Sequence, residues 1–197
     1  MSPDLQKLLD QADELKLAGK YAKAIAACEK ILADDPQCTE AYEEIGDNYI
    51  SLRQLDKAEK ALAKALETDQ SSPNAAYLMG FLHSCQRNWR KSIELLEQAD
   101  SLKPNHPEIL RCLGWSYAMS GDREHGIILL ERARTLAPDD VYVLTDLGVC
   151  YLNEKNIDKA LPIFRRVLEV DPDNEKAREC LMVVEEYAAS SKRLGKN

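Results

Sequence analysis

The sequence repeats with a period of 34 residues, and this period constrains the fold more than any other feature. Two residue types recur at this spacing without an insertion. The glycines are Gly46, Gly80, Gly114 and Gly148, and the prolines are Pro36, Pro104, Pro138 and Pro172, with Gln70 at the position between Pro36 and Pro104. A chain with such a period folds as a stack of similar supersecondary units. Each unit buries its apolar face against its neighbours because it cannot bury that face alone.

Each period contains two short amphipathic helices. Leu110, Leu113, Gly114 and Tyr117 lie at offsets that trace one helical face, and a second apolar stripe begins after the break at Gly121-Asp122. The pattern therefore predicts a chain of helix-turn-helix units.

Polar residues at fixed positions predict where these helices begin. Asn88, Asp122 and Asn156 share the 34-residue spacing, and we expect their side chains to accept backbone N–H groups at the start of each second helix. Ser2, Ser72 and Asp140 are expected to open first helices in the same way. Pro162 lies six residues beyond Asn156 and predicts a kink or a late helix start, because proline has no N–H to donate.

These residues resemble the tetratricopeptide repeat, whose pattern places Leu-Gly and Tyr in a first helix and then a small residue, a bulky residue and Pro. Leu147-Gly148, Tyr151, Ala160, Phe164 and Pro172 match it in one unit. The resemblance implies an all-α fold, a right-handed superhelical α-solenoid. It implies five repeats, a capping helix and a flexible tail, at residues 5–38, 39–72, 73–106, 107–140, 141–174, 175–190 and 191–197.

The capping helix leaves one alternative open. Ala177, Leu181, Val184 and Ala188 form the stripe expected to close the array. A second apolar line, Cys180, Val183 and Tyr187, widens the apolar face. Either this helix is broadly buried, or it makes a contact with a second copy of the chain.

No catalytic, metal or cofactor motif is found. His83 and Cys85 are close in sequence, but residues two apart on a helix point in different directions. His83 also occupies the tyrosine column, so we expect a packed histidine. Asp171-Pro172-Asp173-Asn174 lacks the glycine and the closing glutamate of a calcium loop. The sequence therefore predicts a protein that is not an enzyme and binds no cofactor.

Charge and cysteine usage limit the partners and the compartment. A formal net charge of -8 opposes binding to nucleic acid and to anionic lipid. The longest apolar runs are too short to span a bilayer, and the N-terminus shows no export signal. The six cysteines are scattered, with no Cys-x-x-Cys pair. We therefore expect a cytoplasmic protein with reduced thiols.

In the tetratricopeptide repeat family, first helices line a concave groove through the second, fifth, ninth, twelfth and thirteenth positions of each repeat. From these positions we select a candidate peptide-binding set: Asp13, Glu40, Glu43, Asp47, Tyr77, Phe81, Arg111, Trp115, Met119, Tyr142, Leu152 and Asn153. The set is acidic at its start and apolar or aromatic further on. Trp115 stands out because Leu113, Gly114 and Tyr117 already fill the buried columns.

Two function classes follow from this surface. In the first, the chain is an adaptor whose groove binds a peptide or helix of another protein with apolar and basic residues. In the second, the chain is a structural or self-assembling scaffold subunit that uses repeat edges or the C-terminal helix. Capture of a partner's C-terminal carboxylate is not expected, because Leu9, Asp13, Glu43 and Asp47 stand where such members of the family carry basic or amide side chains. Each candidate also has a simpler interpretation. Trp115 and Phe81 would only pack on neighbouring helices, and the acidic residues would form a solvated face that adds only solubility.

Overall fold

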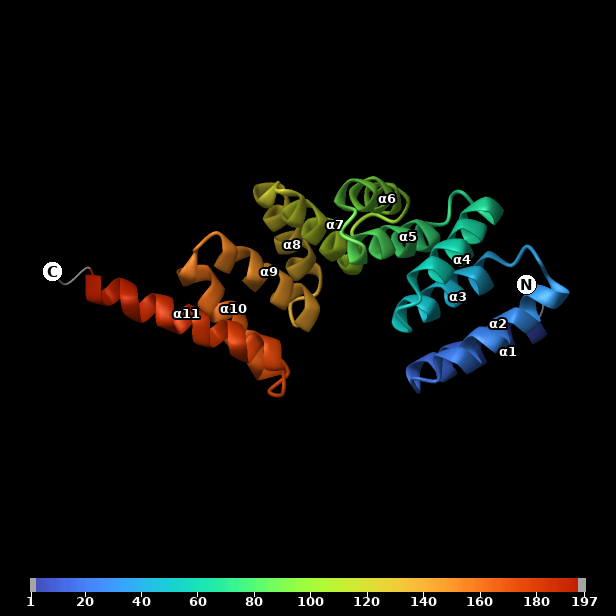
Figure 1. Cartoon of the computed structure of the whole chain (residues 1–197), viewed down its shortest axis with the longest axis horizontal. Helices are drawn as coiled ribbons and strands as arrows, with labels where there is room; N and C mark the ends of the chain where they lie inside the picture. Colours follow the sequence, from blue (N-terminus) through green and yellow to red (C-terminus); the bar gives the residue numbers. More distant parts are fainter. Residues whose placement is uncertain (1–2, 195–197) are drawn as a thin grey trace. The chain divides into compact units, whose positions relative to one another are not determined.

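The computed structural model describes the backbone of residues 3–194 and the side chains of residues 6–187. This part of the chain contains eleven α-helices and no strand (Figure 1). It forms two compact units, residues 1–104 and 105–197. Unit 1 holds α1 (Pro3–Leu17), α2 (Tyr21–Asp34), α3 (Thr39–Ser51), α4 (Leu55–Thr68), α5 (Pro73–Cys85) and α6 (Trp89–Leu102). Unit 2 holds α7 (Pro107–Ser120), α8 (Arg123–Leu136), α9 (Val141–Asn153), α10 (Ile157–Val170) and α11 (Glu175–Leu194).

Helices pair in chain order inside each unit. We call α1, α3, α5, α7 and α9 the first helices, and α2, α4, α6, α8 and α10 the second helices. Each first helix packs on the second helix that follows it. In unit 1, α3 also contacts α1 and α5, and in unit 2, α9 contacts α7 and α11. The helical repeat fold that the period predicts is confirmed.

Glycines that face each other on α7 and α8, Gly114 and Gly126, let these two helices approach closely. A Cβ on Gly126 would lie 2.6 Å from the carbonyl oxygen of Gly114 and 2.7 Å from the backbone nitrogen of Ala118. Real Cβ atoms do not come this close to backbone atoms. The contact between α7 and α8 therefore requires the absence of a side chain at Gly126.

The turn from each first to each second helix contains one residue with a left-handed backbone. These residues recur at the 34-residue period, with positive φ at Gly19, Arg53, Arg87, Gly121 and Lys155. In the second turn, the N–H of the following residue, Gln54, bonds to the carbonyl of Tyr49. This is the helix-ending arrangement that usually selects glycine, but only two of the five positions carry it.

Some predicted helix caps form and others do not. Side chains of Ser72, Asp122, Asp140 and Asn156 accept backbone N–H groups at their helix starts. Asn88 precedes α6 but makes no cap hydrogen bond, so that prediction is wrong. Since the backbone angles at Asn88 nearly equal those at Asn156, the difference lies in the side-chain orientation. The predicted cap at Ser2 lies outside the described residues.

The prediction of a late start at Pro162 is wrong, because α10 begins at Ile157 and continues through the proline. The first turn is held instead by the Asn156 side chain, which accepts the N–H of Lys159. Pro162 is the sixth residue of α10 and removes one backbone hydrogen bond, the one to the carbonyl oxygen of Asp158, which the helix tolerates.

Helix α11 decides between the two alternatives that the sequence left open for its apolar face. Ala177 and Val184 are fully buried, as a capping stripe requires. Val183 and Tyr187 are 42% and 49% exposed, so the interpretation of α11 as a broadly buried helix is wrong. The helix reaches Leu194, and residues 195–197 lie outside the described part, so the flexible tail stays a prediction. The side chain of Ala188 is not among those described.

Candidate functional site

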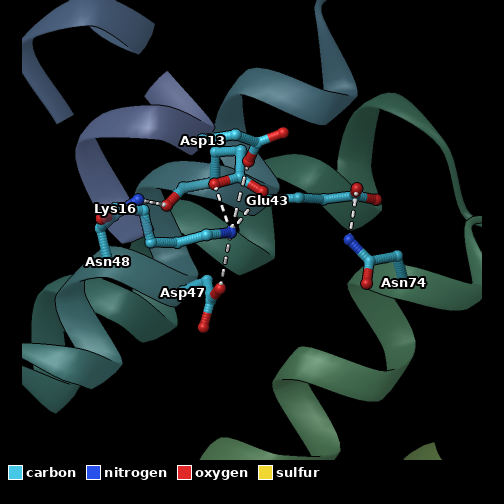
Figure 2. Close-up of polar contacts among 7 residues, drawn as sticks. Asp13, Lys16, Glu43, Asp47, Asn48 and Asn74 are labelled. Atoms are coloured by element: carbon cyan, nitrogen blue, oxygen red, sulfur yellow. Dashed lines mark hydrogen bonds and ion pairs between the residues drawn. The ribbon is translucent and has the colours of Figure 1, made fainter. Parts of the chain in front are cut away.

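The predicted acidic residues of unit 1 are largely held in contacts within the chain (Figure 2). Lys16 on α1 places its ammonium 2.8 Å from Glu44 Oε2 and 3.1 Å from Asp47 Oδ2, both on α3. The same ammonium lies 3.5 Å from Asp13 Oδ1. We call these four residues the Lys16 cluster. It joins α1 to α3 and offsets part of the negative charge that the sequence predicts for a partner.

Electrostatics favours the charged form of Lys16. Burial alone would lower the pKa of Lys16, but the carboxylates of Glu44 and Asp47 raise it above its usual value. Burial raises the pKa of Glu44, and the hydrogen bond from Lys16 opposes this rise. Asp47 is half-buried, while Asp13 and Glu40 are exposed. Among the candidate acids, Asp13 and Glu40 are thus the most open to solvent, although Asp13 also lies within ion-pair distance of Lys16.

Glu43 does not belong to an open binding surface. Its side chain is buried, with 7% of its surface exposed. Ser72 Oγ donates to Glu43 Oε1, and Asn74 Nδ2 donates to Glu43 Oε2 at 2.8 Å. Ser72 in turn accepts the N–H of Ala75 at the start of α5. Glu43 thus ties α3 to the start of α5, because burial of a carboxylate requires such partners.

Two aromatic residues on α5 form the apolar part of the unit 1 surface. The rings of Tyr77 and Phe81 stack with their centroids 6.3 Å apart and their planes 15° apart. Both side chains are half-buried and pack against a core cluster that includes Leu78 and Met79. Each ring therefore has one part in the core and another part open to a ligand.

In unit 2, an ion pair joins α7 to α9. Arg111 Nη1 lies 2.8 Å from Asp146 Oδ2, and both side chains are less than one fifth exposed. The guanidinium also lies 5.7 Å from the centre of the Tyr142 ring, which is 72% exposed. Burial raises the pKa of Asp146, while Arg111 opposes the rise. Arg111 is therefore neutralised by a residue of its own unit and supports an exposed aromatic ring.

The other unit 2 candidates divide by burial. Trp115, Met119 and Leu152 are half-buried and pack against the core cluster of this unit, whereas Asn153 is exposed. Trp115 therefore contributes to the core and keeps part of its surface open. All candidates lie on first helices. We call those of unit 1, without the buried Glu43, the first-helix surface of unit 1, and those of unit 2 the first-helix surface of unit 2.

The sequence did not reveal the contacts that hold the candidates in place, although some of the residues involved, among them Lys16 and Ser72, stand at positions it singled out. The residues that make these contacts are Lys16, Glu44, Ser72, Asn74 and Asp146. The available signal was spacing, since Lys16 occupies the twelfth position of its repeat, one of the positions assigned to the groove. Its partners on α3 follow only from the packing of α1 on that helix.

No metal site or membrane span emerges from the described part of the chain. There, no group of three or more His, Cys, Asp or Glu side chains is arranged to hold a metal ion. His83 is buried and its Nδ1 lies 3.0 Å from Gln86 Oε1, which confirms the expected packed histidine. Among the same residues, no helix is both long and apolar enough to cross a bilayer.

Two models of one protein family match this sequence. Both are described as tetratricopeptide repeat, and they match residues 15–80 and 141–174. The chain belongs to the tetratricopeptide repeat family. No curated protein sequence matches this tetratricopeptide repeat chain.

Solved tetratricopeptide repeat structures share its fold at low sequence identity. TTC0263 from Thermus thermophilus aligns with a TM-score of 0.78 and 19% identity, over 91% of this chain and 98% of that one. MamA aligns with a TM-score of 0.65 and 23% identity, over 89% and 96% of the two chains. YrrB, described as a TPR protein with an unusual peptide-binding site, aligns with a TM-score of 0.64 and 21% identity, over 87% and 89%. At these identities the likeness shows the fold.

Proposed function

We propose that the chain is a non-enzymatic protein-interaction module, which binds a peptide segment or helix of another protein on its first-helix surfaces. Membership of the tetratricopeptide repeat family supports the general role. The observation that carries the specific proposal is the set of aromatic rings left partly or largely open on first helices. These are Tyr77, Phe81, Trp115 and Tyr142.

The internal ion pairs define what the partner must supply. Because Lys16 and Asp146 already neutralise Asp47 and Arg111, charged partner residues gain little there. Apolar or aromatic anchors can cover the open rings without displacing an ion pair. Basic partner residues retain Asp13 and Glu40 as exposed contacts. We therefore expect apolar anchors to dominate, with a micromolar affinity, about -8 kcal/mol.

An affinity capture with matched variants tests the proposal. The wild-type chain is compared with a Phe81→Ala, Trp115→Ala double variant. An Ile128→Ala variant serves as control, because Ile128 is an exposed apolar residue on the second helix α8. Circular dichroism and thermal unfolding verify that all three chains fold.

We expect a specific partner that co-purifies with the wild type and the control but not with the double variant. Direct titration of that purified partner then gives the loss of affinity. A partner retained equally by all three chains would refute binding through these aromatic residues.

One observation favours the alternative of a self-assembling scaffold. Helix α11 exposes Met182, Val183 and Tyr187, and exposed apolar residues that lie together on a helix often mark a contact. Deletion of α11 is a poor test, because Ala177 and Val184 are buried and their removal would uncover the core of unit 2.

Surface substitution tests the scaffold alternative without uncovering the core. Sedimentation of the wild type is compared with sedimentation of a Met182→Glu, Val183→Lys variant. An oligomer that dissociates in the variant would favour the scaffold. A monomeric wild type across a wide concentration range would exclude self-assembly through α11.

A further inference from the structure

Unit 2 contains a pocket of about 800 Å³ that lies outside the candidate first-helix surface. It is lined by α8, α10 and two side chains of α9, together with Pro138 from the turn before α9. None of the candidate residues of the first-helix surface lines it. Any ligand of this pocket is therefore distinct from a ligand of the first-helix surface.

The two second helices around this pocket carry an excess of basic residues, although the whole chain is acidic. Helix α8 has Arg123, Arg132 and Arg134 against Glu124 and Glu131. Helix α10 has Lys159, Arg165 and Arg166 against Asp158 and Glu169. Of the residues that line the pocket itself, three are cations, Arg134, Lys159 and Arg166, and two are acids, Glu131 and Asp158. This small local excess favours an acidic ligand, which the chain as a whole repels.

A hydrogen-bond network connects the polar residues of the pocket. Tyr151 is buried and its hydroxyl donates to Glu131 Oε1 at 2.7 Å. Arg134 Nη2 lies 2.6 Å from Glu131 Oε2. Glu131 therefore has a partner at each carboxylate oxygen and its charge is offset.

Lys159 is a cation of the pocket that takes no part in this hydrogen-bond network. Its ammonium lies 4.9 Å from the centre of the Tyr151 ring, and its side chain is exposed. Among the described residues no carboxylate lies within ion-pair distance of this ammonium, whereas the other two pocket cations, Arg134 and Arg166, are paired. An incoming carboxylate would thus find a charge that no neighbour has neutralised.

Two prolines and two other apolar residues complete the pocket. Pro138 and Pro162 line the pocket and are exposed, whereas its other apolar lining residues, Leu144 and Ile163, are buried in the core. Because Pro162 has no N–H, it cannot form the α-helical hydrogen bond to the carbonyl oxygen of Asp158, another lining residue. Exposed proline rings beside one unpaired cation fit a polypeptide segment better than a small inorganic anion.

We propose that this pocket binds a short acidic peptide segment of a partner protein, with a carboxylate on Lys159 and apolar side chains against the exposed rings of Pro138 and Pro162. The site is independent of the first-helix surfaces. It allows the chain to hold two different segments at once.

Fluorescence anisotropy with a defined probe tests this site. The probe is a fluorescein-labelled peptide of alternating Glu and Leu, and its neutral counterpart carries Gln in place of every Glu. The variants are Lys159→Glu, and Lys155→Glu as the matched charge reversal outside the pocket lining. Tyr142→Ala reports on the first-helix surface of unit 2. Circular dichroism confirms the fold of each.

We expect the acidic peptide to bind the wild type with a dissociation constant on the order of 100 μM. We expect Lys159→Glu to weaken it by about tenfold, while Lys155→Glu and Tyr142→Ala change it by less than about twofold. In NMR titrations the shifted amides should belong to α8 and α10.

Three results would overturn the proposal. The first is equal binding of the Gln peptide, which would remove the role of charge. The second is equal weakening by Lys155→Glu, which would indicate attraction without a site. The third is no binding of the acidic peptide up to about 1 mM, a limit near -4 kcal/mol.

Discussion

Single carboxylates on the first helices of unit 1 have different physical roles. Glu40 is exposed, Asp47 is half-buried and paired with Lys16, and Glu43 is buried with Ser72 and Asn74 as donors. A buried carboxylate with fixed donors stabilises the fold, whereas an exposed one is open to a partner. The same residue type thus supports structure at one position and recognition at another.

Substitution of Glu43 should lower stability. Glu43→Ala leaves the Ser72 hydroxyl and the Asn74 amide without their acceptor, and we expect a loss of about 2–3 kcal/mol in the free energy of unfolding. Urea denaturation monitored by circular dichroism measures it. Glu40→Ala is the control, with an expected change within about 0.5 kcal/mol. Equal effects of the two substitutions would contradict the structural role of Glu43.

Gly126 should tolerate no side chain. In Gly126→Ala the new Cβ meets backbone atoms of α7, which cannot move aside as a flexible side chain can. We expect a loss of at least about 2 kcal/mol by urea denaturation. Gly80→Ala meets mainly the side chains of Leu96 and Leu95 and should cost less. The reverse order of the two variants would show that α7 and α8 do not pack as described.

Thiol reactivity reports on two buried cysteines. Burial, with Glu44 nearby, raises the pKa of Cys28 to about 12, and burial with Asp146 nearby raises the pKa of Cys150 to about 12. Since the thiolate is the reactive form, both should resist Ellman's reagent at about pH 8 in the native chain. The exposed Cys85 should react first, and Cys85→Ser should remove this fast phase. Rapid labelling of Cys28 or Cys150, located by mass spectrometry, would contradict their burial.

At the scale of helices and turns, a shared geometry is reached by unlike residues. The left-handed position after each first helix is Gly19 or Gly121 in two turns but Arg53, Arg87 or Lys155 in the others. A residue with a Cβ costs free energy in this conformation, whereas glycine adopts it readily. The turns therefore differ in strain although their backbones agree.

Arg87→Gly should stabilise unit 1. Arg87 has φ 59° and is exposed, so relief of backbone strain should outweigh the loss of its surface contacts. We expect a gain of about 1 kcal/mol in the free energy of unfolding. Gly19→Ala, at the equivalent turn with φ 68°, should be destabilising by a similar amount. Urea denaturation of both variants measures these changes in the free energy of unfolding. A loss of stability in Arg87→Gly would refute the claim that the Arg87 backbone is strained.

At the scale of the whole molecule, the 34-residue period was sufficient to predict the helical repeat fold and its family. It works because each helix contacts mainly its neighbours in the sequence, so a local pattern carries most of the tertiary information. The roles of Glu43 and Lys16 could not be predicted, because burial and ion pairing depend on which side chains of adjacent helices meet. For the same reason the sequence left open whether the second apolar line of α11 is buried within the chain or exposed.

The candidate peptide-binding set remains a prediction, as do the repeat boundaries and the cytoplasmic location. The structure removes one residue from the candidate peptide-binding set, because Glu43 is buried and bonded within the chain. The proposal of peptide binding therefore rests mainly on the aromatic rings of the set and less on its acidic residues.

Site-specific photo-crosslinking tests the central claim, that a partner binds the first-helix surfaces. A photoreactive phenylalanine analogue replaces Tyr142, the highly exposed aromatic residue on α9, and in a second chain Ile128 on α8. Irradiation with the captured partner should crosslink at position 142 and not at position 128. Crosslinks at position 128 alone would contradict the account and place the interface on the second helices.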